Sequence, residues 1–310
     1  MKTSVVLSSY NGEEYIEEQL QSILEQTLRP DEVLIVDDGS TDSTVTIVKS
    51  FILKNQLEDS WQLRVNQENK GWRRNFMDSF HKASGDVIFS CDQDDIWDKE
   101  RVEKMVLCFE ENPDMEVLAS NFAPFMIKEG KTIPLKNGLT KKKLGVSLKK
   151  RIERVEANKL VLHTFVPGCA LAFRSSLLEI IDIIWFTAWA HDSVISIISK
   201  LRGTYYFMNE TLLYYRRHEG TSTPANVKTC EGRIDFSETY LNRIDIIRNK
   251  TSELGINDSN VALLQTIDSF HKTRIGFFSK NIGLVELLKY INFYSSLYSF
   301  LGDLYIRMKN

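Results

Sequence analysis

Short β-rich runs alternate with helical patterns over the first hundred residues, and this alternation constrains the fold more than any other feature. Apolar residues at helical spacing separate the runs. The expected strands are 5–7, 32–36, 63–65 and 86–90, and the expected helices are 13–26, 43–55 and 71–83, the second capped by Thr41 or Asp42. The pattern predicts an α/β fold with a mainly parallel sheet and covering helices.

The pattern becomes mixed after Pro113. We expect a strand at 117–120, a lysine-rich, loop-rich excursion over 128–151, an apolar block at 167–173, a helix containing His191 and Asp192, and a strand at 211–215. Beyond Glu231 the sequence predicts helices only. This gives an α/β domain over 1–230, with halves 1–112 and 113–230, and a C-terminal helical region over 231–310.

Charge and cysteine usage exclude several classes of protein. A net charge of -3 argues against a nucleic-acid binder that works through overall phosphate attraction. The four cysteines form no CxxC pair, which favours a reducing compartment over a zinc site or a disulfide framework. No signal-peptide pattern and no apolar stretch of roughly 18 residues is seen, so we expect a cytoplasmic protein.

An acidic motif, Asp92-Gln93-Asp94-Asp95, follows the fourth expected strand. Carboxylates this close repel one another unless a cation neutralises them. Oxygen ligands suit Mg²⁺ or Mn²⁺, which would also hold a diphosphate. The alternative is a solvated acidic turn, but ligands bind at this edge of open α/β sheets.

Three other segments are candidates for nucleotide contacts. Asp37-Asp38-Gly39-Ser40 follows the second strand and offers carboxylates to a base or ribose, although the same residues are ordinary turn formers. The loop Ser8 to Gly12 could wrap a nucleobase. Near a helix start, Lys70, Arg73 and Arg74 could meet phosphate, or they could form a solvated face.

These residues resemble the family 2 inverting glycosyltransferases with the GT-A fold, a Rossmann-like nucleotide-binding mixed sheet flanked by helices. The resemblance spans about residues 3 to 220, and its motifs occur in one order: 8–12, 36–42, 69–75, 84–86 and 92–97. Pro167-Gly168-Cys169, His191-Asp192 and Tyr215-Arg216-Arg217-His218 look most like bacterial rhamnosyltransferase-type enzymes of cell-surface polysaccharide synthesis.

The resemblance implies a role for each matching position. The nucleotide-binding residues would be Ser8, Tyr10, Asp38, Lys70, Arg74 and Asp92. Asp92 and Asp94 would form the DXD motif, with Asp94 the direct metal ligand, and Asp192 would be the catalytic base. Many family members have Glu-Asp where this chain has His191-Asp192, so the base is kept and its neighbour, which would orient the acceptor, differs.

Residues after the last expected strand extend this site. His218 could complete the metal site or be structural, and Arg216 and Arg217 could clamp a diphosphate. His191 joins the arginines as an acceptor or diphosphate candidate. Without the resemblance, Asp192 would be read as a structural helix carboxylate.

The implied reaction moves a sugar, rhamnose or another hexose, from a dTDP or UDP donor to a hydroxyl of a glycan, glycolipid or glycoprotein acceptor. Asp192 would take the acceptor proton while Mn²⁺ or Mg²⁺ stabilises the leaving group. The alternatives are a sugar nucleotidyltransferase, whose Gly-rich N-terminal signature Ser8 to Gly12 lacks, and an inactive nucleotide-sugar-binding scaffold.

Two weaker features concern partners. The lysine and arginine clusters at 141–143 and 149–151 could attract an anionic lipid-linked acceptor or the inner face of the cell membrane, or form a solvated loop. C-terminal apolar residues at helical spacing could make a peripheral membrane contact or a homo-oligomer face, but core packing is favoured. These residues are Leu284, Leu287, Leu288, Ile291, Tyr294, Tyr298 and Leu301.

Overall fold

The computed structural model describes residues 1–218 and 228–309, with only the backbone at Lys142. The chain divides into two compact units. Unit 1 contains Met1–Glu156 and Thr164–Thr221, and unit 2 contains Ala157–His163 and Ser222–Asn310. Each unit is described by itself below.

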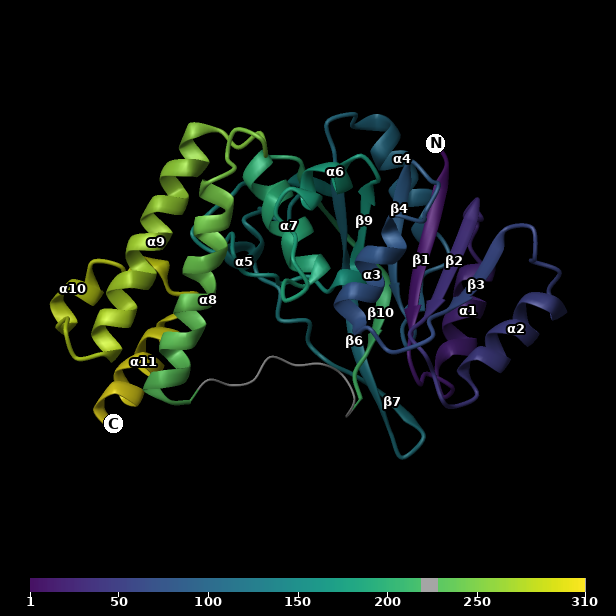
Figure 1. Ribbon diagram of the computed structural model, residues 1–310, viewed down its shortest axis with the longest axis horizontal. Coiled ribbons are helices and arrows are strands. Elements are labelled where there is room, and N and C mark those ends of the chain that lie inside the picture. Colours follow the sequence, from purple (N-terminus) through teal and green to yellow (C-terminus); the bar gives the residue numbers. More distant parts are fainter. Residues whose placement is uncertain (219–227, 310) are drawn as a thin grey trace. The chain divides into compact units, whose positions relative to one another are not determined.

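The described residues of unit 1 form a ten-stranded mixed sheet in the order β3-β2-β1-β4-β9-β6-β10-β5, with β7 beside β6 and β8 beside β10 (Figure 1). The strands are β1 (Thr3–Ser9), β2 (Glu32–Asp37), β3 (Trp61–Val65), β4 (Val87–Asp92), β5 (Ile96–Trp97), β6 (Val117–Lys128), β7 (Lys131–Pro134), β8 (Ile152–Arg154), β9 (Leu171–Arg174) and β10 (Tyr205–Arg216). β1 pairs in parallel with β2 and β4, whereas β9 runs antiparallel between β4 and β6.

Helices connect these strands. They are α1 (Ile16–Leu24), α2 (Thr44–Lys54), α3 (Trp72–Phe80), α4 (Arg101–Glu111), α5 (Lys141–Leu144), α6 (Leu177–Asp182) and α7 (His191–Arg202), with a 3₁₀ turn, η1 (Gly168–Ala170). α1 shows why the amphipathic pattern forms a helix here. It buries Ile16, Leu20 and Ile23, which share one helical face. Glu17 and Glu18 lie in its first turn, where their negative charges stabilise the helix by interacting with the positive end of its dipole.

The expected mixed sheet flanked by helices is confirmed, and the structure differs from the expectation in local details that include the following. The segment 128–151 was expected to be loop-rich, but it contains β7 and α5, and β6 and β7 form an antiparallel hairpin. All four residues of β7 are exposed, so no burial pattern marked it as a strand. The N-cap of α2 is Ser43, not Thr41 or Asp42, although the Asp42 carboxylate accepts a 3.0 Å bond from the Thr44 amide.

The regular elements of residues 228–309 in unit 2 are all helices. Its elements are α8 (Cys230–Arg248), α9 (Asp258–Phe278), α10 (Leu284–Leu288), the 3₁₀ turn η2 (Ile291–Phe293) and α11 (Leu297–Lys309). An aromatic-rich core that includes Phe270, Phe277 and Phe300 surrounds a buried ion pair, in which Arg274 bonds both oxygens of Asp303 at 2.6 and 2.9 Å. Among the described helices, none is long and apolar enough to cross a bilayer.

Candidate active site

The carboxyl ends of three parallel strands bring the predicted nucleotide residues to one edge of the sheet. Ser8 near the end of β1 is the register partner of Val36 in β2 and of Asp92 in β4. Ser9 is the partner of Asp37. Because these strands are parallel and adjacent, the loops that follow them leave the sheet side by side.

Asp38 is buried and organises the loop before α3. One of its oxygens accepts hydrogen bonds from the Lys70 amide at 2.9 Å and the Asn66 side chain at 2.8 Å, and the other accepts one from the Gly71 amide at 2.9 Å. Gly71 has a φ of 82°, which favours glycine. The Asp38 carboxylate therefore holds the loop before α3 in place, and it lies at the edge of the sheet where the nucleotide was predicted to bind.

The first loop is bonded to the acidic motif. The Tyr10 amide donates to Gln93 Oε1 at 2.8 Å, and Gln93 Nε2 donates back to the Tyr10 carbonyl at 3.1 Å. The Tyr10 ring is 45% exposed, so it can stack on a ligand. The Ser8 hydroxyl accepts a 2.8 Å bond from Asn75 in α3. Gln93 thus sets the spacing of two loops, a role that we did not predict.

Lys70 and Arg74, at the start of α3, share the carboxylate of Asp78 near the end of that helix. Lys70 Nζ lies 3.4 Å from Asp78, and Arg74 Nε lies 2.9 Å from it. Both cationic side chains are more than a third exposed. An exposed pair of this kind is weak, so either cation can turn to a phosphate at little cost.

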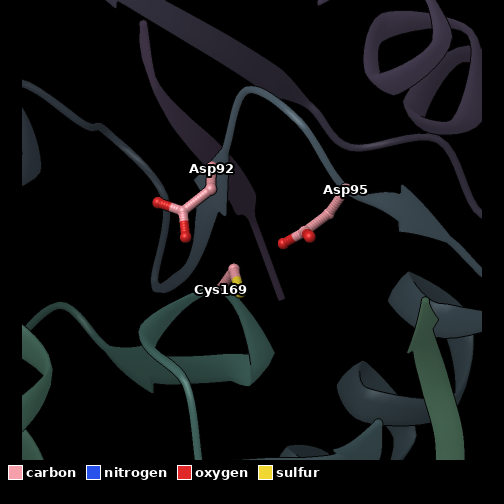
Figure 2. Close-up of side chains that lie close together, drawn as sticks. All are labelled: Asp92, Asp95 and Cys169. Carbon is pink, nitrogen blue, oxygen red and sulfur yellow. The ribbon is translucent and has the colours of Figure 1, made fainter. Parts of the chain in front are cut away.

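The acidic motif holds its carboxylates close to a thiol. Figure 2 shows Asp92 and Asp95 directed toward Cys169, and one ligand atom from each residue lies within 4.8 Å of the others. Burial, followed by repulsion from Asp94, raises the pKa of Asp92 to about 7. Burial also raises the pKa values of Asp95 and Cys169 well above their usual ranges. A nearby cation would remove this electrostatic cost.

Asp94 has a different contact partner, His218. Its Oδ2 lies 2.7 Å from His218 Nε2, and the Tyr15 ring lies 5.1 Å from the imidazole. The two predicted metal ligands, which are 124 residues apart, are therefore in direct contact. Carboxylate and imidazole groups suit Mn²⁺ or Mg²⁺, whereas a neutral Cys169 thiol is a poor ligand for either ion.

Arg216 is buried and forms hydrogen bonds with the acidic turn. Its amide donates to Asp95 Oδ1 at 2.9 Å, and its Nε donates to the Asp94 carbonyl at 2.7 Å. The guanidinium also bonds Glu18 and lies 4.8 Å from the centres of the Tyr15 and Phe125 rings. The Arg216 side chain therefore bonds to groups of the protein itself. The neighbouring Arg217 is only half-buried and lies 5.7 Å from the centre of the Tyr215 ring.

Asp192 and His191 begin α7 in different environments. Asp192 is half-buried, its Oδ1 accepts the Ser193 amide at 2.7 Å, and its charge contributes to the raised pKa of Asp92. His191 is 4% exposed and lies 4.2 Å from the Phe76 ring. Burial lowers the pKa of His191 to about 4, so it is neutral at pH 7. The two neighbours therefore have different surroundings, one charged and one aromatic.

Arg101 is a buried cation that sequence reasoning missed. It donates to the Cys169 carbonyl at 2.8 Å and to Ser120 at 3.2 Å, and it lies 4.6 Å from the centre of the Trp97 ring. Burial lowers its pKa to about 10, which still leaves the guanidinium charged at neutral pH. No local sequence signal marks Arg101, because its hydrogen-bond partners come from β6 and the η1 turn.

Loops with hydroxyl, carboxylate and cationic groups at the carboxyl edge of a parallel sheet are the arrangement in which open α/β folds bind ligands. The sequence profile described as glycosyl transferase family 2 matches residues 4–181, more than half of the chain. The chain belongs to this family of glycosyltransferases.

Individual relatives agree with this assignment. An uncharacterised glycosyltransferase of Nostoc sp. is 27% identical over 80% of this chain and 80% of its own. The dTDP-rhamnosyl transferase RfbG of Shigella flexneri is 27% identical over 87% of this chain and 88% of its own. The structure of Staphylococcus aureus TarS residues 1–349 with UDP-GlcNAc matches with a TM-score of 0.63 and 22% identity, covering 94% of this chain and 79% of that chain. That likeness supports the GT-A fold.

Proposed function

We propose that this glycosyltransferase moves a hexose, rhamnose in the first instance, from a dTDP or UDP donor to a glycan hydroxyl, with inversion. The acceptor would belong to bacterial surface polysaccharide or glycoconjugate synthesis, on the cytoplasmic side. Two relatives support this donor class, since one is named a dTDP-rhamnosyl transferase and the other was solved with UDP-GlcNAc.

The donor nucleotide would lie at the carboxyl edge of β1, β2 and β4, within the proposed nucleotide-binding half at 1–112. Tyr10 would stack on the base, and the cations Lys70 and Arg74 would meet phosphate. Ser8, Asp38 and Asp92 would contact base or ribose directly or hold the loops that do. The exposed Tyr10 ring and the weakly paired cations support these roles.

A divalent cation, Mn²⁺ or Mg²⁺, fits the acidic motif. Asp94 and His218 would hold it, with Asp92 on the nucleotide side. The raised pKa of Asp92 supports this assignment, because an uncompensated cluster of carboxylates is what a cation would neutralise. When bound, the cation would stabilise negative charge on the nucleoside diphosphate leaving group.

Asp192 would be the base, and its position is the observation that carries the proposal. It stands at the start of α7, close enough to Asp92 for the two charges to interact, yet it belongs to a separate element. Asp192 would accept the hydroxyl proton of the acceptor as that oxygen attacks the anomeric carbon from the side opposite the diphosphate. Attack from that side inverts the anomeric configuration.

The remaining candidates divide by their contacts. Arg217 keeps its proposed place as a diphosphate contact from the acceptor-side half, 113–230. The contacts of Arg216 support a positioning role for the acidic turn over direct contact with diphosphate. Burial of His191 among aromatic rings likewise supports a packing role that sets the direction of Asp192.

A donor panel tests the proposal. Purified protein is incubated with dTDP-rhamnose, UDP-glucose, UDP-galactose and UDP-GlcNAc, with and without Mn²⁺ or Mg²⁺, and release of the nucleoside diphosphate is measured. We expect metal-dependent release with one donor and a glycan acceptor. Release of pyrophosphate from a nucleoside triphosphate and a sugar phosphate would instead indicate a nucleotidyltransferase. Nucleotide binding without transfer or hydrolysis would indicate a scaffold.

A further inference from the structure

The last helix of unit 2 has two apolar faces. Its inner face buries Phe300 and Ile306 in the core of the unit, and Asp303 pairs there with Arg274. The outer face carries Leu297, Tyr298, Leu301, Tyr305 and Met308, which are 62%, 87%, 48%, 66% and 87% exposed. With about 100° per residue, these five side chains occupy one continuous stripe, here called the outer stripe.

α10 repeats this arrangement over a shorter length. Leu287 is fully buried, whereas Leu284, Val285 and Leu288 are exposed. A surface helix normally places polar residues opposite its buried face. Contiguous exposed apolar side chains indicate an interaction site. The prediction of core packing for this segment therefore holds for Leu287 and Tyr294, but most of the other apolar residues face outward.

The charges of the segment that contains the outer stripe favour one kind of partner. Residues 279–310 contain the cations Lys280, Lys289, Arg307 and Lys309 and only two carboxylates, Glu286 and Asp303. Asp303 is buried, and Glu286 accepts a 2.6 Å hydrogen bond from Lys289. Glu286 and Lys289 therefore offset each other, and the half-buried Arg307 donates to the Phe277 carbonyl. Lys280, Arg307 and Lys309 leave the segment net positive, which complements a negatively charged layer with an apolar interior.

The aromatic residues point to the same layer. Tyr298 and Tyr305 expose a ring with a polar tip, the chemistry that gathers where lipid headgroups meet acyl chains. An amphipathic helix with cations at its rim binds such an interface without crossing it. We propose that the outer stripe of α11, with α10, docks unit 2 on an anionic bilayer surface.

Vesicle co-sedimentation of the full chain tests this proposal. The probes are vesicles of phosphatidylcholine alone and vesicles with about one-third phosphatidylglycerol. We expect binding to the anionic vesicles to be stronger by on the order of tenfold and to weaken with salt. The variant Tyr298→Glu/Met308→Glu changes the two most exposed positions and should lose this binding. The control Leu53→Glu, at a 63% exposed apolar residue of α2, should keep it.

The same variants also distinguish membrane binding from misfolding and from dimer formation through the outer stripe. Circular dichroism melting shows whether Tyr298→Glu/Met308→Glu folds. If it does not, Leu301→Lys/Tyr305→Lys keeps the positive charge, removes the apolar face and should also lose binding. Equal sedimentation of folded outer-stripe variants and wild type would overturn the proposal. So would a lipid-free dimer, detected by light scattering, that the same substitutions dissociate, because a second copy would then cover the stripe.

Discussion

At the residue scale, Asp92 links the acidic motif to stability. Its raised pKa means that the folded protein, without metal, binds a proton more tightly than the unfolded chain does. Between the unfolded pKa of 3.8 and the folded value of about 7, the folded state holds more protons, so this contribution to the free energy of unfolding falls as pH rises. The destabilisation of the folded state by ionised Asp92 is fully present above pH 7.

Asp92→Asn should therefore stabilise the metal-free protein at pH 8 by ~1–3 kcal/mol and have little effect at pH 4. Urea unfolding at both pH values, in the presence of a chelator, measures the difference. Asp98→Asn at another half-buried carboxylate is the matched control. Equal stabilisation by Asp92→Asn at the two pH values would contradict the electrostatic account.

Arg216 provides a second prediction at this scale. Arg216→Lys keeps the positive charge and the hydrogen bond from the backbone amide to Asp95. It removes the hydrogen bond from Nε to the Asp94 carbonyl. Loss of a charged hydrogen bond, worth ~1.5–3 kcal/mol, should raise the Mn²⁺ concentration for half-maximal transfer by roughly tenfold or more. Saturating Mn²⁺ should restore most of the rate.

Arg64→Lys on the exposed side of β3 is the control for this titration. If Arg216 acted on the diphosphate itself, the KM for the donor would rise and saturating metal would not restore the rate. If the variant only misfolded, neither metal nor donor would restore activity.

At the element scale, the contact between η1 and α7 sets the direction of the proposed base. A Cβ at Gly168 would lie 2.9 Å from His191 Nε2 and 3.1 Å from Asp192 Cβ. Gly168→Ala should therefore shift the start of α7 and reduce kcat for transfer by roughly tenfold to a hundredfold, while nucleotide affinity changes little. Gly283→Ala, where a Cβ meets nothing within 4 Å, is the control.

Isothermal titration with the nucleoside diphosphate separates the two effects of Gly168→Ala. Retained nucleotide binding with reduced transfer fits a displaced base. Unchanged transfer would show that the register between η1 and α7 does not matter for the reaction.

Elements with strong local patterns could be predicted from the sequence, and others could not. The apolar runs of β1 and β2 and the helical spacing of α1 were sufficient, because burial of these elements shows directly in the order of residues. β7 was missed because all of its residues are exposed. The insertion of β9 between β4 and β6 depends on long-range pairing, which has no local signal.

The site shows the same division. Asp94 and His218 were both candidates for a metal site, and they are in contact, although a structural role for His218 was the stated alternative. Arg101 and Gln93 were not predicted, since each acts through residues from distant segments. Arg216 was predicted to clamp a diphosphate, whereas its burial and its contacts with the acidic turn depend on the folded structure and have no local signal.

At the scale of the whole molecule, unit 2 has a core of its own that depends on a buried ion pair. Asp303 accepts hydrogen bonds from Arg274 and from Tyr294 at 2.8 Å. Removal of one partner from a buried pair typically costs about 3–5 kcal/mol. Asp303→Ala should therefore lower the melting temperature of unit 2, and calorimetry should show its transition separating from that of unit 1. Asp258→Ala at the exposed start of α9 should leave the calorimetric profile nearly unchanged. One unsplit transition for Asp303→Ala at the wild-type temperature would contradict this view.

The chain as a whole is a GT-A glycosyltransferase of family 2. We propose that residues of different elements bind the donor and remove the acceptor proton. Transfer by Asp192→Asn, measured beside nucleotide affinity in the same preparation, tests this most directly. We predict a fall in kcat of roughly 10²–10⁴-fold with nucleotide affinity within about twofold of wild type. Full transfer activity in Asp192→Asn would contradict the account, because another group would then have to take the acceptor proton.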